Sequence, residues 1–445
     1  MNAFQRRGAC PALSTPMQTG DGLLVRLNPV AGGLSPKTLI GLSESAARHG
    51  NGIMEVTARG SIQIRGLTSA SAVQLAAEVN ALGIAVRTGV PVETGPLAGL
   101  DAQEIADSRP LAGAISRAIE KADLAGRLGP KVSVVVDGGG AFSLDAILAD
   151  IRLVAVQGGG NAGWHLATGG TAITARPMAL LDEEGACEAT LAILQTIAAM
   201  GHEGRARDLS TSPLPTTSDT AAPISEQRRP TDSIPIGILS LANQAHAVGI
   251  ALPFGSMSAE RIARLCLEAA KRGAVEIRPA PQRILLFLGL LQEACIDLQQ
   301  AATTLGFVTG PTDPRLHIAA CPGEPACASG RMATRVIAET VAASHPGLFD
   351  GSFTLHVSGC AKGCAHPAMA ALTLVGGENG AGLVVDGTAK ALPPRYSPRY
   401  EAARGIGRVA ALAGNARRGN ETVAACLARL GEAAITDAFA RLGTD

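Results

Sequence analysis

The chain has 445 residues, which is enough for two or three domains with separate cores. Its 38 basic and 38 acidic residues cancel, so the composition argues against nucleic acid or an acidic membrane as a partner. No apolar run reaches the roughly 18 residues of a membrane span, and neither a signal sequence nor a secretory cysteine pattern is present, so we expect a cytoplasmic protein with reduced thiols.

Two stretches far apart in the chain have the same pattern. They are Leu34–Gly50, LSPKTLIGLSESAARHG, and Met257–Gly273, MSAERIARLCLEAAKRG. Aligned without a gap, both have a serine suited to cap a helix, apolar residues at helical spacing and a closing glycine, so each predicts a helix. A strand precedes each helix, GLLVRLN or HAVGIALP, and a strand pair follows, GIMEV with SIQIRG or AVEIR with RILLFLG.

This repeated order of strand, helix, strand and strand predicts a duplicated fold whose halves are related by a pseudo-twofold axis. A cleft between such halves is a natural ligand site. Residues 96–200 and 314–385 both mix helix-like and strand-like runs, so we expect a second duplicated layer, with cysteines inserted into its later copy. Residues 204–235 are rich in Pro, Ser and Thr, which indicates a linker between the two halves.

Four cysteines form two close pairs, spaced as C-x5-C in CPGEPAC and as C-x3-C in CAKGC. Structural zinc sites favour gaps of about two to four residues in both pairs, whereas a cubane iron–sulfur cluster tolerates wider and unequal loops. The spacing therefore favours a cluster, with zinc or four simply buried thiols as the alternatives. We expect the second cysteine to lie near the N-terminus of a helix, whose dipole would offset the charge of a cluster. The four residues are Cys321, Cys327, Cys360 and Cys364.

The order of half-units, linker and cysteine pairs resembles the siroheme nitrite and sulfite reductase superfamily. Within that superfamily, RRGACPALSTPMQTGDGLLVRL, CPGEPACASG and SGCAKGCAHP are most similar to the precorrin-3B synthase branch. The resemblance implies an α+β fold of duplicated ferredoxin-like half-domains and duplicated mixed α/β sheet domains, with a [4Fe–4S] cluster on the four cysteines. The implied segments are 1–90, 91–203, the linker 204–235, 236–305, the cluster-bearing 306–400 and a helical 401–445.

The basic residues that surround the oxyanion in the siroheme reductases are only half retained. TARGSIQ keeps the arginine of the reductase pattern as Arg59, but the next arginine position is Val90. LGPKVSV keeps one lysine of a pair as Lys131 and has Ser133 at the second position. A pocket for nitrite or sulfite should not lose these charges, since each would stabilise the reacting oxyanion. The resemblance instead implies that Arg59 and Lys131 orient the carboxylates of a precorrin.

The implied activity is the conversion of precorrin-3A to precorrin-3B with dioxygen, in aerobic cobalamin biosynthesis. One oxygen atom would become a hydroxyl at a meso carbon, and a γ-lactone would form. The family is associated with a mononuclear non-haem iron beside the cluster, which would receive electrons from it. We expect no siroheme. NADH would be the nominal electron source and would act through a separate reductase, because no nicotinamide or flavin motif is found.

No pair of histidines has a familiar iron-binding spacing, so the iron ligands are chosen by position alone. Each candidate also has a structural role as its plain alternative. Two other functions stay open, a siroheme-dependent nitrite or sulfite reductase and a non-catalytic protein that binds a cluster or zinc. The candidate iron ligands, which lie near the repeat or near the cysteines, are His49, His317, His356 and His366.

Overall fold

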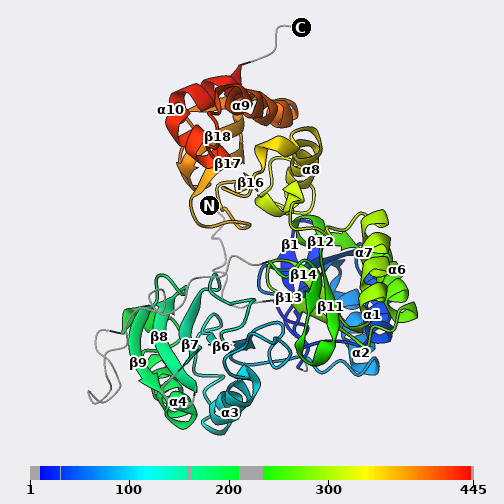
Figure 1. Cartoon of the computed structure of the whole chain (residues 1–445), viewed down its shortest axis with the longest axis vertical. Coiled ribbons are helices and arrows are strands. Elements are labelled where there is room, and N and C mark those ends of the chain that lie inside the picture. Colours follow the sequence, from blue (N-terminus) through cyan, green and yellow to red (C-terminus); the bar gives the residue numbers. More distant parts are fainter. Residues whose placement is uncertain (1–10, 31, 158–161, 210–233, 442–445) are drawn as a thin grey trace.

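A computed structural model describes residues 11–30, 32–157, 162–209 and 234–441. Most of the predicted linker, residues 210–233, lies outside the described residues. Figure 1 shows three lobes, which are the paired half-units in blue and green, a teal and green lobe beside them, and a yellow to red lobe above. No helix in the described ranges is long and apolar enough to cross a membrane.

The first half-unit forms one sheet with the strand order β1-β2-β4-β3-β12, and the second forms another with the order β10-β11-β14-β13. The elements of the first are β1 (Met17–Thr19), β2 (Gly22–Leu27), α1 (Pro36–His49), β3 (Ile53–Val56), β4 (Ile62–Leu67) and α2 (Ser69–Ala81). Those of the second are β10 (Gly237–Ser240), β11 (His246–Ala251), β12 (Ser256–Ser258), α6 (Ala259–Lys271), β13 (Glu276–Ala280), β14 (Ile284–Leu290) and α7 (Gln292–Thr304).

The two half-units exchange edges, as a pseudo-twofold axis requires. Strand β12 of the second half pairs with β3 of the first, where Met257 lies opposite Met54. The matching residue of the first half, Leu34, bridges to Ile277 of β13. Helices α1 and α6 pack on each other, and one apolar core runs through both halves. The matched serines Ser35 and Ser258 both cap their helices, as the sequence predicts.

The other two sheets repeat a second topology. Three parallel strands are followed by two antiparallel ones, in the orders β5-β6-β7-β8-β9 and β15-β16-β17-β18-β19. The first copy contains β5 (Val92–Thr94), α3 (Ser108–Lys121), β6 (Val134–Asp137), β7 (Ala149–Gln157), β8 (Ala162–Gly170), β9 (Arg176–Leu181) and α4 (Glu183–Ala199). The second contains β15 (Ile318–Ala320), α8 (Thr334–Ser344), β16 (Leu355–Ser358), β17 (Ala370–Gly377), β18 (Gly380–Gly387), β19 (Arg395–Ser397), α9 (Ala402–Ala416) and α10 (Val423–Ala440).

These two copies align without a gap through the loops that matter for the site. Strand β5 matches β15 and helix α3 matches α8, so the loops between them have the same length. The loops that follow β6 and β16 also have the same length. The prediction that the cysteines are inserted into the later copy is therefore wrong. They occupy positions of the later copy that other residue types occupy in the earlier copy. In chain order, the four cysteines match Gly95, Asp101, Gly139 and Ser143.

Helix α10 packs on β17, β18 and β19, helix α9 packs on α8 and α10, and both helices share the core of the second copy. The predicted helical segment 401–445 thus completes the cysteine-bearing lobe. Among the described residues, six short 3-10 helices connect other elements. They are η1 (Ala206–Asp208), η2 (Ala242–Gln244), η3 (Pro253–Gly255), η4 (Pro314–His317), η5 (Pro346–Leu348) and η6 (Arg399–Glu401).

Candidate cofactor and substrate sites

The four cysteines lie on two loops at one edge of a sheet. Strands β15 and β16 are parallel neighbours, with Ala320 opposite Val357. Cys321 directly follows β15, and Cys360 lies two residues after the end of β16. Because the carboxyl ends of parallel strands meet at the same edge, the topology brings the two loops that carry the predicted cysteine pairs to the same edge of the sheet.

Hydrogen bonds join the two loops around the first cysteine. The Gly359 amide donates to Cys321 Sγ over 3.2 Å, and the Arg331 amide donates to Gly359 O over 2.8 Å. A side chain at Gly359 would begin 3.3 Å from Gly323 Cα and 3.6 Å from Cys321 Sγ, so there is little room for one at this position. The backbone therefore forms a tight cradle around one sulfur.

The thiols differ in exposure. Cys321 is buried, Cys327 and Cys360 are half-buried, and Cys364 is exposed. Burial raises the pKa of the Cys321 thiol, and amide hydrogen bonds from Gly359 and Gly323 oppose that rise. Within the described ranges, no three His, Cys, Asp or Glu side chains form a group that could hold a metal ion. The donor atoms and the cradle suit a cluster, and the ligand assignment stays a prediction.

Cys327 precedes the N-terminus of α8, as the sequence predicts, but it does not lie in the first turn of the helix. A separate turn intervenes, in which the Gly330 amide donates to Cys327 O over 2.8 Å. The helix begins only at Thr334, after Ala333, which makes no side-chain cap. The helix dipole therefore does not act directly on Cys327. The positive groups in contact with a cysteine sulfur are instead the amides of Gly359 and Gly323, which donate to Cys321 Sγ.

Two of the candidate histidines lie together under the second cysteine loop. The rings of His356 and His366 are 5.7 Å apart and meet edge to face. A side-chain carbon at Gly363, the residue before Cys364, would lie 3.7 Å from His356 Cε1. His356 is fully buried in β16, and neither ring nitrogen has a hydrogen-bond partner among the described residues. Burial, with a smaller effect of His366, lowers the pKa of His356 to about 4.

The other two candidate histidines are placed differently. His317 is half-buried in η4, just before β15. His49 ends α1 and its Nε2 lies 2.8 Å from Oε1 of Glu78 in α2, so its ring already has a partner within the first half-unit. Ser45 and Arg48 donate to the same carboxylate. The contacts of His49 are those of a structural residue.

Replacing Glu78 by glutamine tests this structural role. Hydrogen bonds from His49 and Ser45 lower the pKa of the Glu78 carboxyl from 4.5 to about 2. Because the folded pKa is depressed, the stabilisation is fully present above pH 4.5 and is lost as the pH falls towards 2. The variant should be less stable by up to about 1 kcal/mol at pH 7, and the difference should vanish near pH 2. Urea unfolding across pH would show this, and a difference independent of pH would contradict it.

A cavity of about 600 Å³ lies between the paired half-units and the first copy of the second layer. Arg59, in the β3–β4 turn, is among its lining residues. It donates to Leu148 O over 2.5 Å, and its guanidinium is 4.0 Å from the carboxylate of Glu93. Lys131 is exposed in the turn before β6 and does not line this cavity. The structure thus places the two predicted basic residues apart.

An ionic network that the sequence did not indicate joins the first half-unit to the cysteine-bearing lobe. Arg65 of β4, with a side chain only 5% exposed, donates to Asp21 over 2.9 and 3.0 Å and to Ala326 O over 2.8 Å. Glu55 of β3 accepts from Arg335 of α8 and lies 3.5 Å from Arg65. The network therefore holds the loop before Cys327 against the half-unit.

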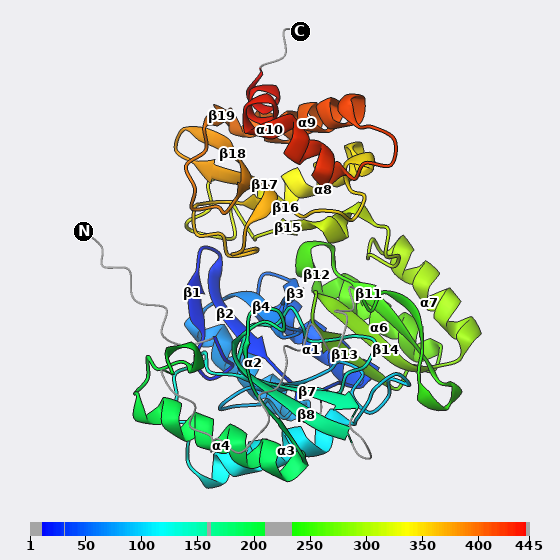
Figure 2. The same ribbon diagram turned by 60° about the vertical axis from the view of Figure 1, so that its left-hand side comes forward.

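The β1–β2 hairpin reinforces this contact. A side chain at Gly20 would overlap the backbone of Cys327 and Ala328. Figure 2 shows the hairpin directly below the cysteine-bearing lobe. The partners in this interface are far apart in the chain, so no local motif could have revealed them.

Comparison with known proteins agrees with this architecture. Residues 15–82 match the nitrite/sulfite reductase ferredoxin-like half domain. A precorrin-3B synthase from Sinorhizobium sp. is 40% identical over 437 residues, which cover 98% of this chain and 95% of that protein. The chain belongs to the precorrin-3B synthase family.

The precorrin-3B synthase family shares its fold with a solved structure, that of the Mycobacterium tuberculosis NirA protein. The two align with a TM-score of 0.73 over 93% of this chain and 84% of that chain, at 19% identity. Identity this low shows the fold alone. With the half-domain match at residues 15–82, it confirms the predicted α+β fold with ferredoxin-like half-domains for this member of the precorrin-3B synthase family.

Proposed function

We propose that the protein is a precorrin-3B synthase, an oxygen-dependent monooxygenase that acts on precorrin-3A. The observation that carries this proposal is the 40% identity, over almost the whole chain, to a protein of that name. The product would carry a hydroxyl at a meso carbon and a γ-lactone. Balance requires two electrons besides dioxygen, with the second oxygen atom leaving as water. NADH would supply these electrons through a separate reductase.

The four cysteines would hold a [4Fe–4S] cluster, which would supply electrons one at a time for the activation of dioxygen. The chain's own contribution is to hold the ligands. Amides of Gly359 and Gly323 donate to Cys321 Sγ, which favours the thiolate that a cluster requires. His356, His366 and His317 remain the candidates for a mononuclear iron, whereas His49 is not carried further because its ring bonds Glu78.

We further propose that Arg59 and Lys131 orient carboxylates of the substrate. Arg59 is 41% exposed and reaches the cavity, and Lys131 is exposed. Replacing Arg59 by glutamine should raise KM for precorrin-3A about tenfold, because a charge-assisted hydrogen bond contributes about 1.5–3 kcal/mol, and should leave kcat nearly unchanged. The Lys131→Gln variant should raise KM less. Steady-state kinetics would measure both.

Arg176→Gln is the matched control for these variants. Arg176 is exposed on β9, at the opposite edge of the sheet from β5. Its KM should equal that of the wild type. A drop in kcat without a change of KM in Arg59→Gln would contradict a role in substrate binding.

The decisive experiment supplies the anaerobically purified protein with precorrin-3A, a reductant and ¹⁸O-labelled dioxygen. The product should gain one labelled oxygen atom by mass spectrometry. Visible spectra and metal analysis of the same sample should show iron and sulfide without siroheme bands. Strong siroheme bands together with nitrite or sulfite reduction would favour a reductase instead, and a colourless zinc protein would exclude both enzymes.

A further inference from the structure

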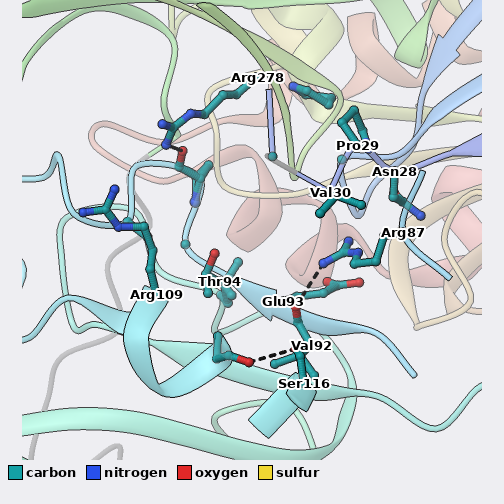
Figure 3. Close-up of a pocket in the computed structure, with 18 of the residues that line it drawn as sticks. Asn28, Pro29, Val30, Arg87, Val92, Glu93, Thr94, Arg109, Ser116 and Arg278 are labelled. Atoms are coloured by element: carbon teal, nitrogen blue, oxygen red, sulfur yellow. Dashed lines mark hydrogen bonds between the residues drawn. The ribbon is translucent and has the colours of Figure 1, made fainter. Parts of the chain in front are cut away.

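The cavity between the half-units and the first α/β copy is rich in arginine. Figure 3 shows Arg278 reaching it from β13, Arg109 from α3, and Arg87 beside Glu93 from the chain around β5. Among the described residues, Glu93 is the one carboxylate that lines it. The five cationic residues of the lining are Arg59, Arg87, Arg109, Arg117 and Arg278.

The pseudo-twofold axis relates this cavity to the contact between β3 and α8 in the cysteine-bearing lobe, where an ion pair joins the two elements. Met54 and Ile277 occupy matched positions, since each pairs with the matched residue of the opposite half. The next residues, Glu55 and Arg278, therefore also match. The second residue of α8, Arg335, likewise matches Arg109, the second residue of α3.

Charge differs between the two matched contacts. On the cysteine-bearing side, Glu55 accepts hydrogen bonds from Arg335 and from Gln63, so an ion pair closes the contact between β3 and α8. On the other side, a like-charged pair, Arg278 and Arg109, lines an open space. A carboxylate is thus missing where the pseudo-symmetry would place one.

Neighbours in the chain satisfy these two arginines only in part. Arg278 Nε lies 2.8 Å from Glu276, and Arg109 Nη2 lies 2.7 Å from Asp107, so each holds a carboxylate on its own element. Neither acidic residue lines the cavity. Arg59 and Arg87 lie near Glu93, and Arg87 also donates to Val92 O over 2.9 Å. With five arginines and one carboxylate, the described lining keeps an excess of positive charge.

Glu93 is itself nearly buried, with a side chain 15% exposed. Burial raises its pKa, and the nearby Arg59 and Arg87 only partly offset this effect. The single carboxylate of Glu93 can neutralise at most one of the arginines that line the cavity. An anion bound in the cavity could therefore interact with the remaining arginines without competition from another carboxylate of the described lining.

We propose that this cavity is a carboxylate-binding site, in which a carboxylate of a ligand lies against Arg109 and Arg278 as Glu55 lies against Arg335. The remaining arginines favour a ligand with two or more carboxylates. A volume of about 600 Å³ accommodates a whole small tricarboxylate or the side-chain arms of a larger molecule. Two sources share this chemistry, a free polycarboxylate and the carboxylate rim of precorrin-3A. Only the second source rests on the proposed function.

Calorimetric titration of the intact protein with citrate, at low ionic strength, tests the site. The variants Arg109→Gln and Arg117→Gln are suitable, because both residues are exposed on α3 and their loss should leave the fold intact. Each should raise the Kd for citrate about tenfold, in proportion to one lost charge-assisted contact. The Arg176→Gln control should bind citrate as the wild type does. Circular dichroism would verify folding of every variant.

Titration of precorrin-3A into the same variants separates the two sources. If the rim carboxylates use the site, precorrin-3A should compete with citrate, and its Kd and KM should rise in both variants. If a free polycarboxylate uses it, only the citrate affinity should fall. Wild-type affinity for citrate in both α3 variants would overturn the proposal, as would equally tight binding of inorganic phosphate, which would mark a general anion site. Failure of the wild type to turn over precorrin-3A, with citrate binding intact, would reject the proposed function alone.

Discussion

Replacement of Cys327 by serine is expected to abolish the proposed iron–sulfur signal of the protein and its proposed monooxygenase activity. A cluster binds thiolates, and a serine hydroxyl at the same position is neither deprotonated nor soft enough to replace one. Loss of even an outer-shell partner of a metal site costs about 10–100-fold, so loss of a ligand should lower activity by about 100-fold or more. Visible absorption, iron content and product formation would measure the effect.

The same result is expected for Cys321, Cys360 and Cys364. Cys187→Ser is the matched control, because that thiol is half-buried on α4 in the other copy of the layer. It should retain both the cluster and the activity. Retention of a full cluster in any of the four variants would contradict the ligand assignment for that residue.

Replacement of Arg65 by methionine should have the largest effect on stability. The change leaves Asp21 and Glu55 without a close cation on β4, in a position where the arginine side chain is 5% exposed. Removing one partner from a buried ion pair costs about 3–5 kcal/mol, because the remaining charge stays buried. Urea unfolding of the protein should show a loss of this size. Iron should also be lost faster to a chelator, because Ala326 O loses its donor next to Cys327.

Arg404→Met provides the comparison for a surface pair. Arg404 lies 2.7 Å from Glu401 but its side chain is 75% exposed, so the cost should stay below about 1 kcal/mol. The double variant Arg65→Met, Asp21→Asn should recover part of the loss, because it also removes the carboxylate left without its partner, and a double-mutant cycle would quantify this. Equal costs for Arg65→Met and Arg404→Met would show that the network does not stabilise the interface.

Local patterns predicted the elements of the fold well. Ser35 and Ser258 cap the matched helices because a capping serine and a closing glycine act within a few residues. The edge exchange between the half-units, with Leu34 against Ile277, depends on how two complete sheets meet. No signal within either segment encodes that contact, so the sequence indicated the duplication but not its register.

The candidate sites were predictable to a similar extent. The sequence placed each cysteine pair after a strand, and the structure shows that these two strands are parallel neighbours. The assignment of the four thiols to a cluster stays a prediction. A turn separates Cys327 from the start of the next helix at Thr334, and His49 proved to bond Glu78. Arg59 was found through the resemblance, whereas Arg109 and Arg278 are ordinary arginines in the sequence. Their role could be inferred only from the structure, in which the pseudo-symmetry matches Arg109 with Arg335 and Arg278 with Glu55.

The equal length of the loops in the two α/β copies has a consequence for how the chain could diversify. The architecture is that of a fused homodimer, in which each copy offers the same backbone edge to the shared central pair of half-units. The two edges differ by residue type alone, with four cysteines on one and glycine, aspartate and serine at the matched positions of the other, while the loop lengths are equal. In a homodimer the two edges would have the same sequence. In a single chain the two copies can differ in sequence, so each edge can have its own function while the common core is kept.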